Sequence, residues 1–299
     1  MSSSVRFEGT FTALVTPFKE DLSIDWDAFD RLVESQIAGG VDGIVPCGTT
    51  GESPALSHEE QLELVKRCVK LAKGKCVVLA GTGTNSTKST IANSQAAARA
   101  GADAVMVVVP YYNKPTQEGL RRHFVEVAAA VDVPVVVYNI PGRTGIDLGV
   151  ETLSRICQEA SNVVAIKEAT GNVLRAQEIV RTIGSRITVL SGDDALTLPM
   201  IAVGARGVIS VTSNLYPAEV ARATRLALEG KLEEARREHL ALCTVHEAMF
   251  VESNPAPIKA ALAHAGRMKD VVRGPLAPVS DGARAKVVAA IRSYEERAR

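Results

Sequence analysis

Residues 104–109 read AVMVVV, and residues 133–138 read VPVVVY. Neither run alternates apolar with polar residues, as a strand with one solvent-facing side would. Both runs are typical of strands that are buried on both faces, as in a parallel sheet covered by helices. They therefore predict an α/β fold with a parallel sheet at its centre.

Similar short apolar runs recur along the first 228 residues, with stretches of helical spacing between them. The eight predicted strands are 10–15, 43–46, 77–81, 104–109, 135–138, 163–167, 188–191 and 207–210. Eight such units predict a (β/α)8 TIM barrel. A doubly wound open sheet is the alternative, but it would need a glycine-rich phosphate turn after the first strand, where the chain reads TPFKE.

After the last predicted strand only helical patterns remain. They cover 232–250, 257–265 and 280–298, and are separated by NPAP at 254–257 and by Gly274-Pro275. We expect a barrel domain with the catalytic site over residues 1–228 and a C-terminal appendage of three helices over residues 229–299. Within the barrel, the spacing of Ser57 and Glu60 predicts a capping box at the start of a helix.

Composition excludes several classes of protein. The chain has 34 basic and 34 acidic residues and 4% aromatic residues, which argues against nucleic-acid and membrane-surface partners. No apolar run approaches the roughly 20 residues of a membrane helix, and no secretory signal is visible, so we expect a cytoplasmic protein. The five cysteines form no C-x-x-C pair, which favours buried free thiols over a disulfide framework or a zinc cluster.

Lys167 is the lysine that closes an apolar strand at the C-terminal end, where TIM barrels carry their active sites. Strand alternation places it on the same face as Val163 and Ala165. Glu168 follows directly and faces the other way, so it is a poor partner for the Lys167 charge. An unpaired buried lysine is suited to Schiff-base formation, because desolvation favours the uncharged amine that acts as the nucleophile.

Further polar groups stand at the same ends of other strands. The loop CGTTGES at 47–53 could bind a carboxylate through its backbone N–H groups, although a tight turn without a ligand is the simpler interpretation of this loop alone. Three of the five tyrosines, Tyr111, Tyr112 and Tyr138, lie at strand ends, and a hydroxyl there could move protons. Arg143 could bind a second carboxylate by a bidentate pair, or it could be a surface residue in a turn.

Metal-dependent chemistry finds little support in the sequence. All five histidines fall in helix-like segments, and none has metal-ligand spacing such as H-E-x-x-H. We expect no metal. The best acidic pair, Asp193-Asp194, is placed to cap the helix that follows it.

Six motifs occur in a specific order along the chain: GTTGES (48–53), PYYNKP (110–115), YNIPGRTG (138–145), IKEATG (166–171), SGDDA (191–195) and GVISVTSN (207–214). With them the sequence resembles, essentially end to end, the pyruvate-dependent class I aldolase and lyase superfamily, and within it the dihydrodipicolinate synthase family. The resemblance implies condensation of pyruvate with L-aspartate 4-semialdehyde on the route to diaminopimelate and lysine. It also implies a homotetramer of tight dimers, and no cofactor besides the covalent Schiff base.

The resemblance also implies catalytic roles for individual residues. Lys167 would form the Schiff base with pyruvate, and Tyr138 would act as the acid and base. Thr49 would link Tyr138 by hydrogen bonds to Tyr112, which the neighbouring subunit would supply.

Substrate binding is implied in the same way. Thr50 would bind the carboxylate of pyruvate, and Arg143 would bind that of the aldehyde. Gly192 and Ile209 would line the pocket through their backbone groups. Acetylneuraminate lyases and keto-deoxy sugar-acid aldolases share the lysine, the tyrosine and the first loop, so they remain alternatives, although Arg143 favours the synthase. A non-catalytic barrel that binds keto acids is the alternative from another class.

Some members of the family are inhibited by lysine at a separate site, and part of that site is present here. The matching residues are Ser53, His58, Asn85 and Tyr111. Gln61 stands where sensitive enzymes commonly carry His, Ser89 stands where they carry Glu, and Pro54 replaces a small residue. Without a carboxylate at position 89 the ammonium of lysine loses its partner, which predicts weak or absent feedback inhibition.

Overall fold

The computed structural model describes residues 5–298, which form a closed barrel of parallel strands. Each strand pairs with the next one in the chain, and the last pairs with the first. The strands are β1 (Gly9–Ala13), β2 (Gly43–Val45), β3 (Val77–Gly81), β4 (Ala104–Val108), β5 (Val135–Asn139), β6 (Val163–Glu168), β7 (Thr188–Ser191) and β8 (Gly207–Ser210). The predicted TIM barrel is confirmed, and every strand end lies within two residues of its expected position.

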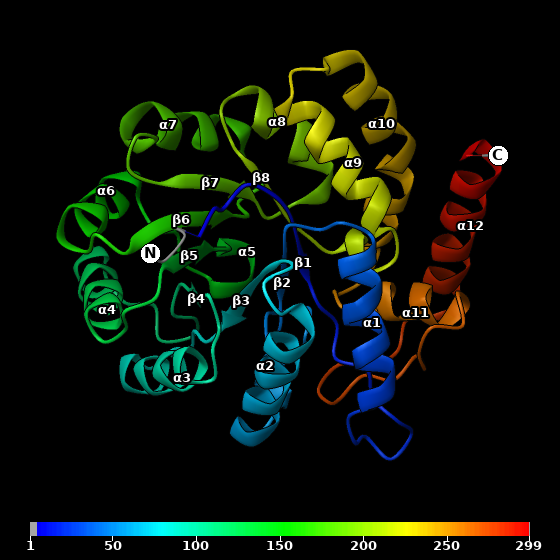
Figure 1. Cartoon of the computed structure of the whole chain (residues 1–299), viewed down its shortest axis with the longest axis horizontal. Helices are drawn as coiled ribbons and strands as arrows, with labels where there is room; N and C mark the ends of the chain where they lie inside the picture. Colours follow the sequence, from blue (N-terminus) through cyan, green and yellow to red (C-terminus); the bar gives the residue numbers. More distant parts are fainter. Residues whose placement is uncertain (1–4, 299) are drawn as a thin grey trace.

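Helices follow the strands and surround the barrel (Figure 1). They are α1 (Trp26–Ala38), α2 (His58–Ala72), α3 (Thr87–Arg99), α4 (Gln117–Ala129), α5 (Pro141–Thr144), α6 (Val150–Glu159), α7 (Val173–Ile183), α8 (Thr197–Ala202) and α9 (Pro217–Leu228). Short 3-10 helices are η1 (Ser53–Ala55), η2 (Asp194–Leu196) and η3 (Thr212–Asn214). The predicted capping box is confirmed, because Ser57 and Glu60 each accept a hydrogen bond from the backbone amide of the other.

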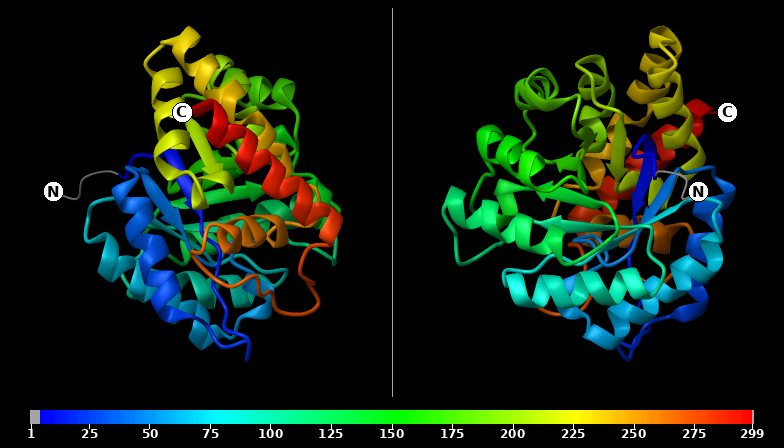
Figure 2. Two further views of the ribbon diagram at one scale, coloured as in Figure 1. Left: turned by 90° about the vertical axis from the view of Figure 1, so that its right-hand side faces the viewer. Right: turned by 60° about the vertical axis from the view of Figure 1, so that its left-hand side comes forward.

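Three helices follow the barrel and gather on one side of it (Figure 2). They are α10 (Leu232–Ala248), α11 (Ala256–His264) and α12 (Asp281–Ala298). Leu242, Ile258 and Ile291 from these helices belong to the same apolar core as the helix-facing residues of the barrel. The three-helix appendage is confirmed. The boundary between two domains at residue 228 stays a prediction, since the core is continuous across it.

A second, smaller core fills the interior of the barrel with the inward-facing residues of each strand, among them Phe11, Leu79 and Met106. A Cβ atom on Gly43 would lie 2.2 Å from the Phe11 ring, so glycine makes room for the aromatic side chain. This core closes the barrel below its C-terminal end, where the polar residues lie.

Two further expectations concern the whole chain. All five cysteines are free and four of them are buried, as predicted. Within residues 5–298, no helix has the length and apolar character needed to span a membrane.

Candidate active site

Lys167 lies at the C-terminal end of β6 and is only 5% exposed. It stands opposite Tyr138 in the pairing of β5 with β6, and its Nζ lies 4.3 Å from the centre of the Tyr138 ring. Within the described part of the chain, Lys167 takes part in no ion pair. A buried amine without a carboxylate partner is therefore present where the sequence predicted it.

The path of β6 corrects one detail of that prediction. The register between β5 and β6 shifts after Val135, which pairs with Val163, so that Val136 pairs with Ala165. One extra residue on β6 reverses the alternation at that point. Ala165 faces the interior with Lys167, as expected, but Val163 belongs to the outer core. The sequence gives no signal for this bulge, because the residues on both faces of the strand are apolar at this point.

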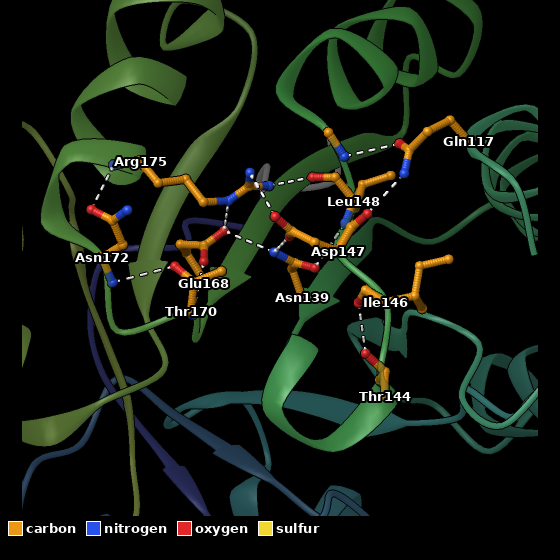
Figure 3. A network of polar contacts seen from close by, with 11 residues as sticks. Gln117, Asn139, Thr144, Ile146, Asp147, Leu148, Glu168, Thr170, Asn172 and Arg175 are labelled. Atoms are coloured by element: carbon orange, nitrogen blue, oxygen red, sulfur yellow. Dashed lines mark hydrogen bonds and ion pairs between the residues drawn. The ribbon is translucent and has the colours of Figure 1, made fainter. Parts of the chain in front are cut away.

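Glu168 lies on the outer face of β6 and is 2% exposed. Its carboxylate pairs with Arg175 of α7 at 3.0 Å and accepts a hydrogen bond from Asn139 Nδ2 at 3.3 Å (Figure 3). Asn139 follows Tyr138, so the residues next to the two inward-facing side chains bond to each other outside the barrel. These contacts fix the ends of β5 and β6 against one another. As predicted, Glu168 does not pair with Lys167.

The same network anchors the loop between β5 and α6, which contains α5. Asn139 donates to Asp147 Oδ1 at 2.8 Å and accepts from the Leu148 amide at 3.2 Å. Arg175 donates to the Leu148 carbonyl, and Gln117 donates to the Asp147 carbonyl at 2.8 Å (Figure 3). The far end of the loop is therefore tied to β5, α7 and α4.

Arg143 lies in α5 and lines a cavity of about 360 Å³. Thr49 from the loop after β2 and Tyr111 from the loop after β4 line the same cavity. Cys47 also lines it, but burial raises the pKa of its thiol to about 12, which makes it a poor nucleophile at neutral pH. The cavity thus offers hydroxyls and a guanidinium, which are groups that bind carboxylates.

A larger hollow of about 1220 Å³ lies at the N-terminal ends of the strands. Two of its carboxylates are engaged with the barrel backbone, because Asp42 accepts from the Thr10 amide and Asp103 from the Val78 amide, each at 2.8 Å. These two groups stabilise strand ends. TIM-barrel active sites lie at the opposite, C-terminal ends of the strands, where the smaller cavity is. Of the predicted site residues, Thr49, Tyr111 and Arg143 line this cavity, whereas Lys167, Tyr138 and Thr50 are not among its lining residues.

The loop at 47–53 adopts a strained backbone. Cys47 and Glu52 have φ values of 58° and 56°, in the left-handed region that costs non-glycine residues about 1–2 kcal/mol each. Lys259 of α11 is 0% exposed; its Nζ pairs with the Glu52 carboxylate and donates to the Val271 carbonyl at 2.7 Å. Burial lowers the pKa of Lys259 to about 8, although the Glu52 charge opposes this shift. The appendage thus holds the loop in place.

Asn254, between α10 and α11, makes a second contact from the appendage and is 5% exposed. Its Nδ2 donates to Thr50 Oγ1 at 3.0 Å, and its backbone carbonyl accepts from Arg143 Nη2 at 3.1 Å. Neither Asn254 nor the Lys259–Glu52 pair is predicted from the sequence. The NPAP break signalled the end of a helix, but no local pattern predicts contacts between residues more than 200 positions apart.

Residues 6–294 match the model of the dihydrodipicolinate synthetase family. The chain belongs to this family. It is 58% identical over 296 residues to a 4-hydroxy-tetrahydrodipicolinate synthase of Sorangium cellulosum, covering 99% of this chain and 98% of that one. Two solved structures are similar as well. The synthase of Methylacidiphilum fumariolicum SolV has a TM-score of 0.96 at 44% identity, covering 98% of this chain and 97% of that one. The chloride-inhibited synthase of Acinetobacter baumannii complexed with pyruvate has a TM-score of 0.95 at 38% identity, covering 97% and 99%.

Of the remaining residues predicted for the family's pocket, Gly192 directly follows β7 and Ile209 lies on β8. The Gly192 amide donates to the Glu168 carbonyl at 2.8 Å, and a Cβ atom on Gly192 would lie 2.5 Å from that of Ala169. Only glycine allows β6 and β7 to approach so closely here. Ile209 is 1% exposed and belongs to the interior core with Tyr138.

Tyr112 differs from the other predicted residues, because its side chain is 88% exposed. Its φ of 72° is in the left-handed region. Within residues 5–298, no hydrogen bond joins the hydroxyls of Tyr112, Thr49 and Tyr138. One subunit by itself therefore does not assemble the predicted relay.

The residues predicted for lysine binding are only partly together. Ser53 and Gln61 line the cavity beside Tyr111, and Gln61 Nε2 donates to the Ser53 carbonyl at 2.9 Å. His58 and Ser89 are exposed, and neither of them lines this cavity.

The last predictions to compare with the structure concern metal ligands and the acidic pair Asp193-Asp194. Among residues 5–298, no group of three or more His, Cys, Asp or Glu side chains is arranged to hold a metal ion. Asp193 caps η2, as predicted, by accepting from the Ala195 amide at 3.0 Å. Asp194 does not cap: it is buried and accepts from the Val211 and Thr212 amides at the end of β8.

Proposed function

We propose that this protein condenses pyruvate with L-aspartate 4-semialdehyde to 4-hydroxy-tetrahydrodipicolinate, in the diaminopimelate and lysine pathway. The observation that carries the proposal is Lys167, a buried amine at the mouth of the barrel that has no ion pair within residues 5–298 and lies 4.3 Å from the centre of the Tyr138 ring. The names of the relatives and the pyruvate in the Acinetobacter baumannii structure support it.

The first half of the reaction joins pyruvate to the enzyme. Lys167 Nζ, in its uncharged form, attacks the C2 carbonyl carbon of pyruvate and gives a carbinolamine. Protonation of its hydroxyl lets water leave, and a protonated imine remains. Loss of a proton from the pyruvate methyl group then gives an enamine. Tyr138 is the residue that donates and accepts these protons. Thr49 becomes its hydrogen-bond partner only once the relay with Tyr112 is assembled, since residues 5–298 of one subunit do not form this bond.

The second half forms the carbon–carbon bond. The enamine carbon attacks the aldehyde carbon of the semialdehyde, and the resulting alkoxide takes a proton. The amino group of the semialdehyde then attacks the imine carbon and displaces Lys167, which closes the ring and frees the enzyme. Thr50 binds the carboxylate of pyruvate, and Arg143 binds that of the semialdehyde by a bidentate pair. Gly192 and Ile209 contribute backbone groups to the pocket.

The covalent Schiff base on Lys167 is the only group this reaction requires besides its two substrates. Tyr112 completes the relay from a neighbouring subunit, which its 88% exposure supports. The assembly is a homotetramer of tight dimers in the cytoplasm, with no nucleic-acid or membrane partner.

Feedback inhibition by lysine is weak or absent in this proposal. Ser53, His58, Asn85 and Tyr111 are present, but Ser89 offers no carboxylate to an ammonium group. A hydrogen bond to a charged group contributes about 1.5–3 kcal/mol, so its loss weakens binding by at least tenfold. Half-inhibition of the purified enzyme by submillimolar lysine would contradict this.

A comparison of aldehyde substrates tests the proposed reaction. With pyruvate as the common substrate, we expect kcat/KM to be highest for aspartate semialdehyde and lower for N-acetylmannosamine and glyceraldehyde. A preference for a sugar would assign the chain to the sugar-acid aldolases. Formation of a pyruvate adduct on Lys167 without turnover of any aldehyde would indicate a binding protein.

A further inference from the structure

Asn254 occupies a position between the two proposed carboxylate sites. Its side chain contacts Thr50, its backbone carbonyl contacts Arg143, and the residue is 5% exposed. Its Oδ1 atom is buried and has no hydrogen-bond partner within residues 5–298. A buried amide with half of its hydrogen-bonding capacity unused is costly unless a ligand or water completes it.

The hydrogen bond to Thr50 determines what the Thr50 hydroxyl can do. Because Asn254 Nδ2 donates to Oγ1, the hydroxyl proton must point elsewhere. Within the described residues, no acceptor takes this proton, although Thr50 is 2% exposed. The hydroxyl is thus available as a donor, and a carboxylate is a ligand that only accepts hydrogen bonds.

Asn254 contacts Arg143 through its backbone and not through its side chain. The carbonyl of Asn254 engages Nη2 only, and the other guanidinium nitrogens of Arg143 make no hydrogen bond or ion pair within residues 5–298. A single bond can therefore fix the side chain while leaving donors for a bidentate pair with a carboxylate. A substitution that changes only the side chain of residue 254 retains this backbone carbonyl.

We propose that Asn254 is a positioning residue that serves both carboxylate sites, with its side chain holding the Thr50 hydroxyl as a donor for pyruvate and its backbone carbonyl holding Arg143 for the second substrate. This inference rests on the proposed function, since it takes the roles of Thr50 and Arg143 from it. It also assigns the C-terminal appendage a part in substrate binding. The two halves of the role are separable, because mutation removes the side chain and retains the carbonyl.

The test measures KM for each substrate in Asn254→Asp and Asn254→Ala. In the Asp variant a carboxylate accepts the Thr50 proton and adds a negative charge, so KM for pyruvate rises by about tenfold or more. In the Ala variant Thr50 loses its partner, and KM for pyruvate rises by about threefold or more. KM for aspartate semialdehyde and kcat at saturating substrate stay within about twofold in both variants.

A matched control separates positioning from a general effect on folding. Asn162 donates through Nδ2 to the backbone carbonyls of Ala128 and Val131, remote from the cavity. We expect Asn162→Asp to lower Tm without changing either KM. In a Thr50→Val background, Asn254→Ala should raise KM for pyruvate no further, because its effect passes through Thr50.

Equal increases in both KM values, or an unchanged KM for pyruvate in a folded variant, would overturn the inference. If Asn254→Asp does not fold, the Ala variant and the double variant decide by the same criteria. The proposed function fails separately, since it fails when the unmutated enzyme forms no pyruvate adduct on Lys167. A normal adduct together with an unchanged KM in the variants would refute the role of Asn254 alone.

Discussion

Two buried lysines, Lys167 at the end of β6 and Lys259 in α11, share an aromatic neighbour but differ in their bonding. Each Nζ lies over an aromatic ring, at 4.3 Å from the centre of Tyr138 and at 4.1 Å from that of Phe18. Lys259 pairs with a buried carboxylate and donates to a backbone carbonyl, whereas Lys167 takes part in no ion pair within residues 5–298. Burial alone therefore does not identify a reactive lysine. The feature that distinguishes Lys167 is that it is buried without a bonded partner.

A lowered pKa does not by itself identify the nucleophile. Burial lowers the pKa of Lys259 to about 8, so a sizeable uncharged fraction exists in mildly alkaline solution. Lys259 is nevertheless 0% exposed, and its Nζ is occupied by Glu52 and Val271. A substrate carbonyl cannot approach it. The two lysines therefore differ in the access of a substrate to Nζ and in the bonding of Nζ. Substitutions test this difference, from the largest expected effect to the smallest.

Replacement of the nucleophile should have the largest effect. We expect Lys167→Met to lower kcat/KM by at least about 10⁴-fold, because no other group can form the Schiff base. The variant should fold normally, since methionine is an unbranched side chain of similar size and Lys167 takes part in no ion pair within residues 5–298. Steady-state kinetics and thermal unfolding measure the two quantities. Retention of more than about 1% of the activity would contradict the assignment.

Removal of the Tyr138 hydroxyl comes next. Tyr138→Phe keeps the ring beside Lys167 and deletes the proposed acid and base, so we expect kcat to fall by about 10²–10⁴-fold. The rate of adduct formation with pyruvate should fall in parallel. As a control at the same end of the barrel, Tyr111→Phe should change kcat by much less, because no proton-transfer role is proposed for Tyr111.

Breaking the structural pair should affect stability more than chemistry. Lys259→Met leaves the Glu52 carboxylate buried without its cation, and we expect the free energy of unfolding to fall by about 3–5 kcal/mol. The double variant with Glu52→Gln should recover part of this loss. Chemical denaturation measures both. If the single variant were as stable as the parent, the pair would not hold the 47–53 loop.

The smallest effect concerns acid stability. His123 in α4 is buried, its Nε2 has no partner within residues 5–298, and burial lowers its pKa from 6.5 to about 4. Between these values the unfolded chain binds the proton and the native protein does not, so stability falls as pH drops below about 6.5. The loss reaches about 3 kcal/mol near pH 4. His123→Gln should remove this part of the pH dependence, and the exposed control His58→Gln should not. Parallel curves for all three proteins would contradict the prediction.

Local patterns in the sequence were sufficient for the barrel, the C-terminal helices and the position of Lys167. Unbroken apolar runs predict buried strands, and a lysine that ends such a run is conspicuous. The bulge at Val164 could not be predicted, since both faces of that strand are apolar. Asn254 and the Lys259–Glu52 pair were missed because their partners are distant in the chain and only the closed barrel brings them together. Position at a strand end singled out Tyr112 and Arg143 as candidates, but their specific roles followed from the family motifs.

The most direct test of the distinction between the two lysines is reduction with borohydride in the presence of pyruvate, followed by peptide mass mapping. We expect a pyruvate-derived adduct on the peptide that contains Lys167 and none on the peptide that contains Lys259. Incubation without pyruvate gives the background. An adduct on Lys259, or no adduct on Lys167, would contradict this expectation.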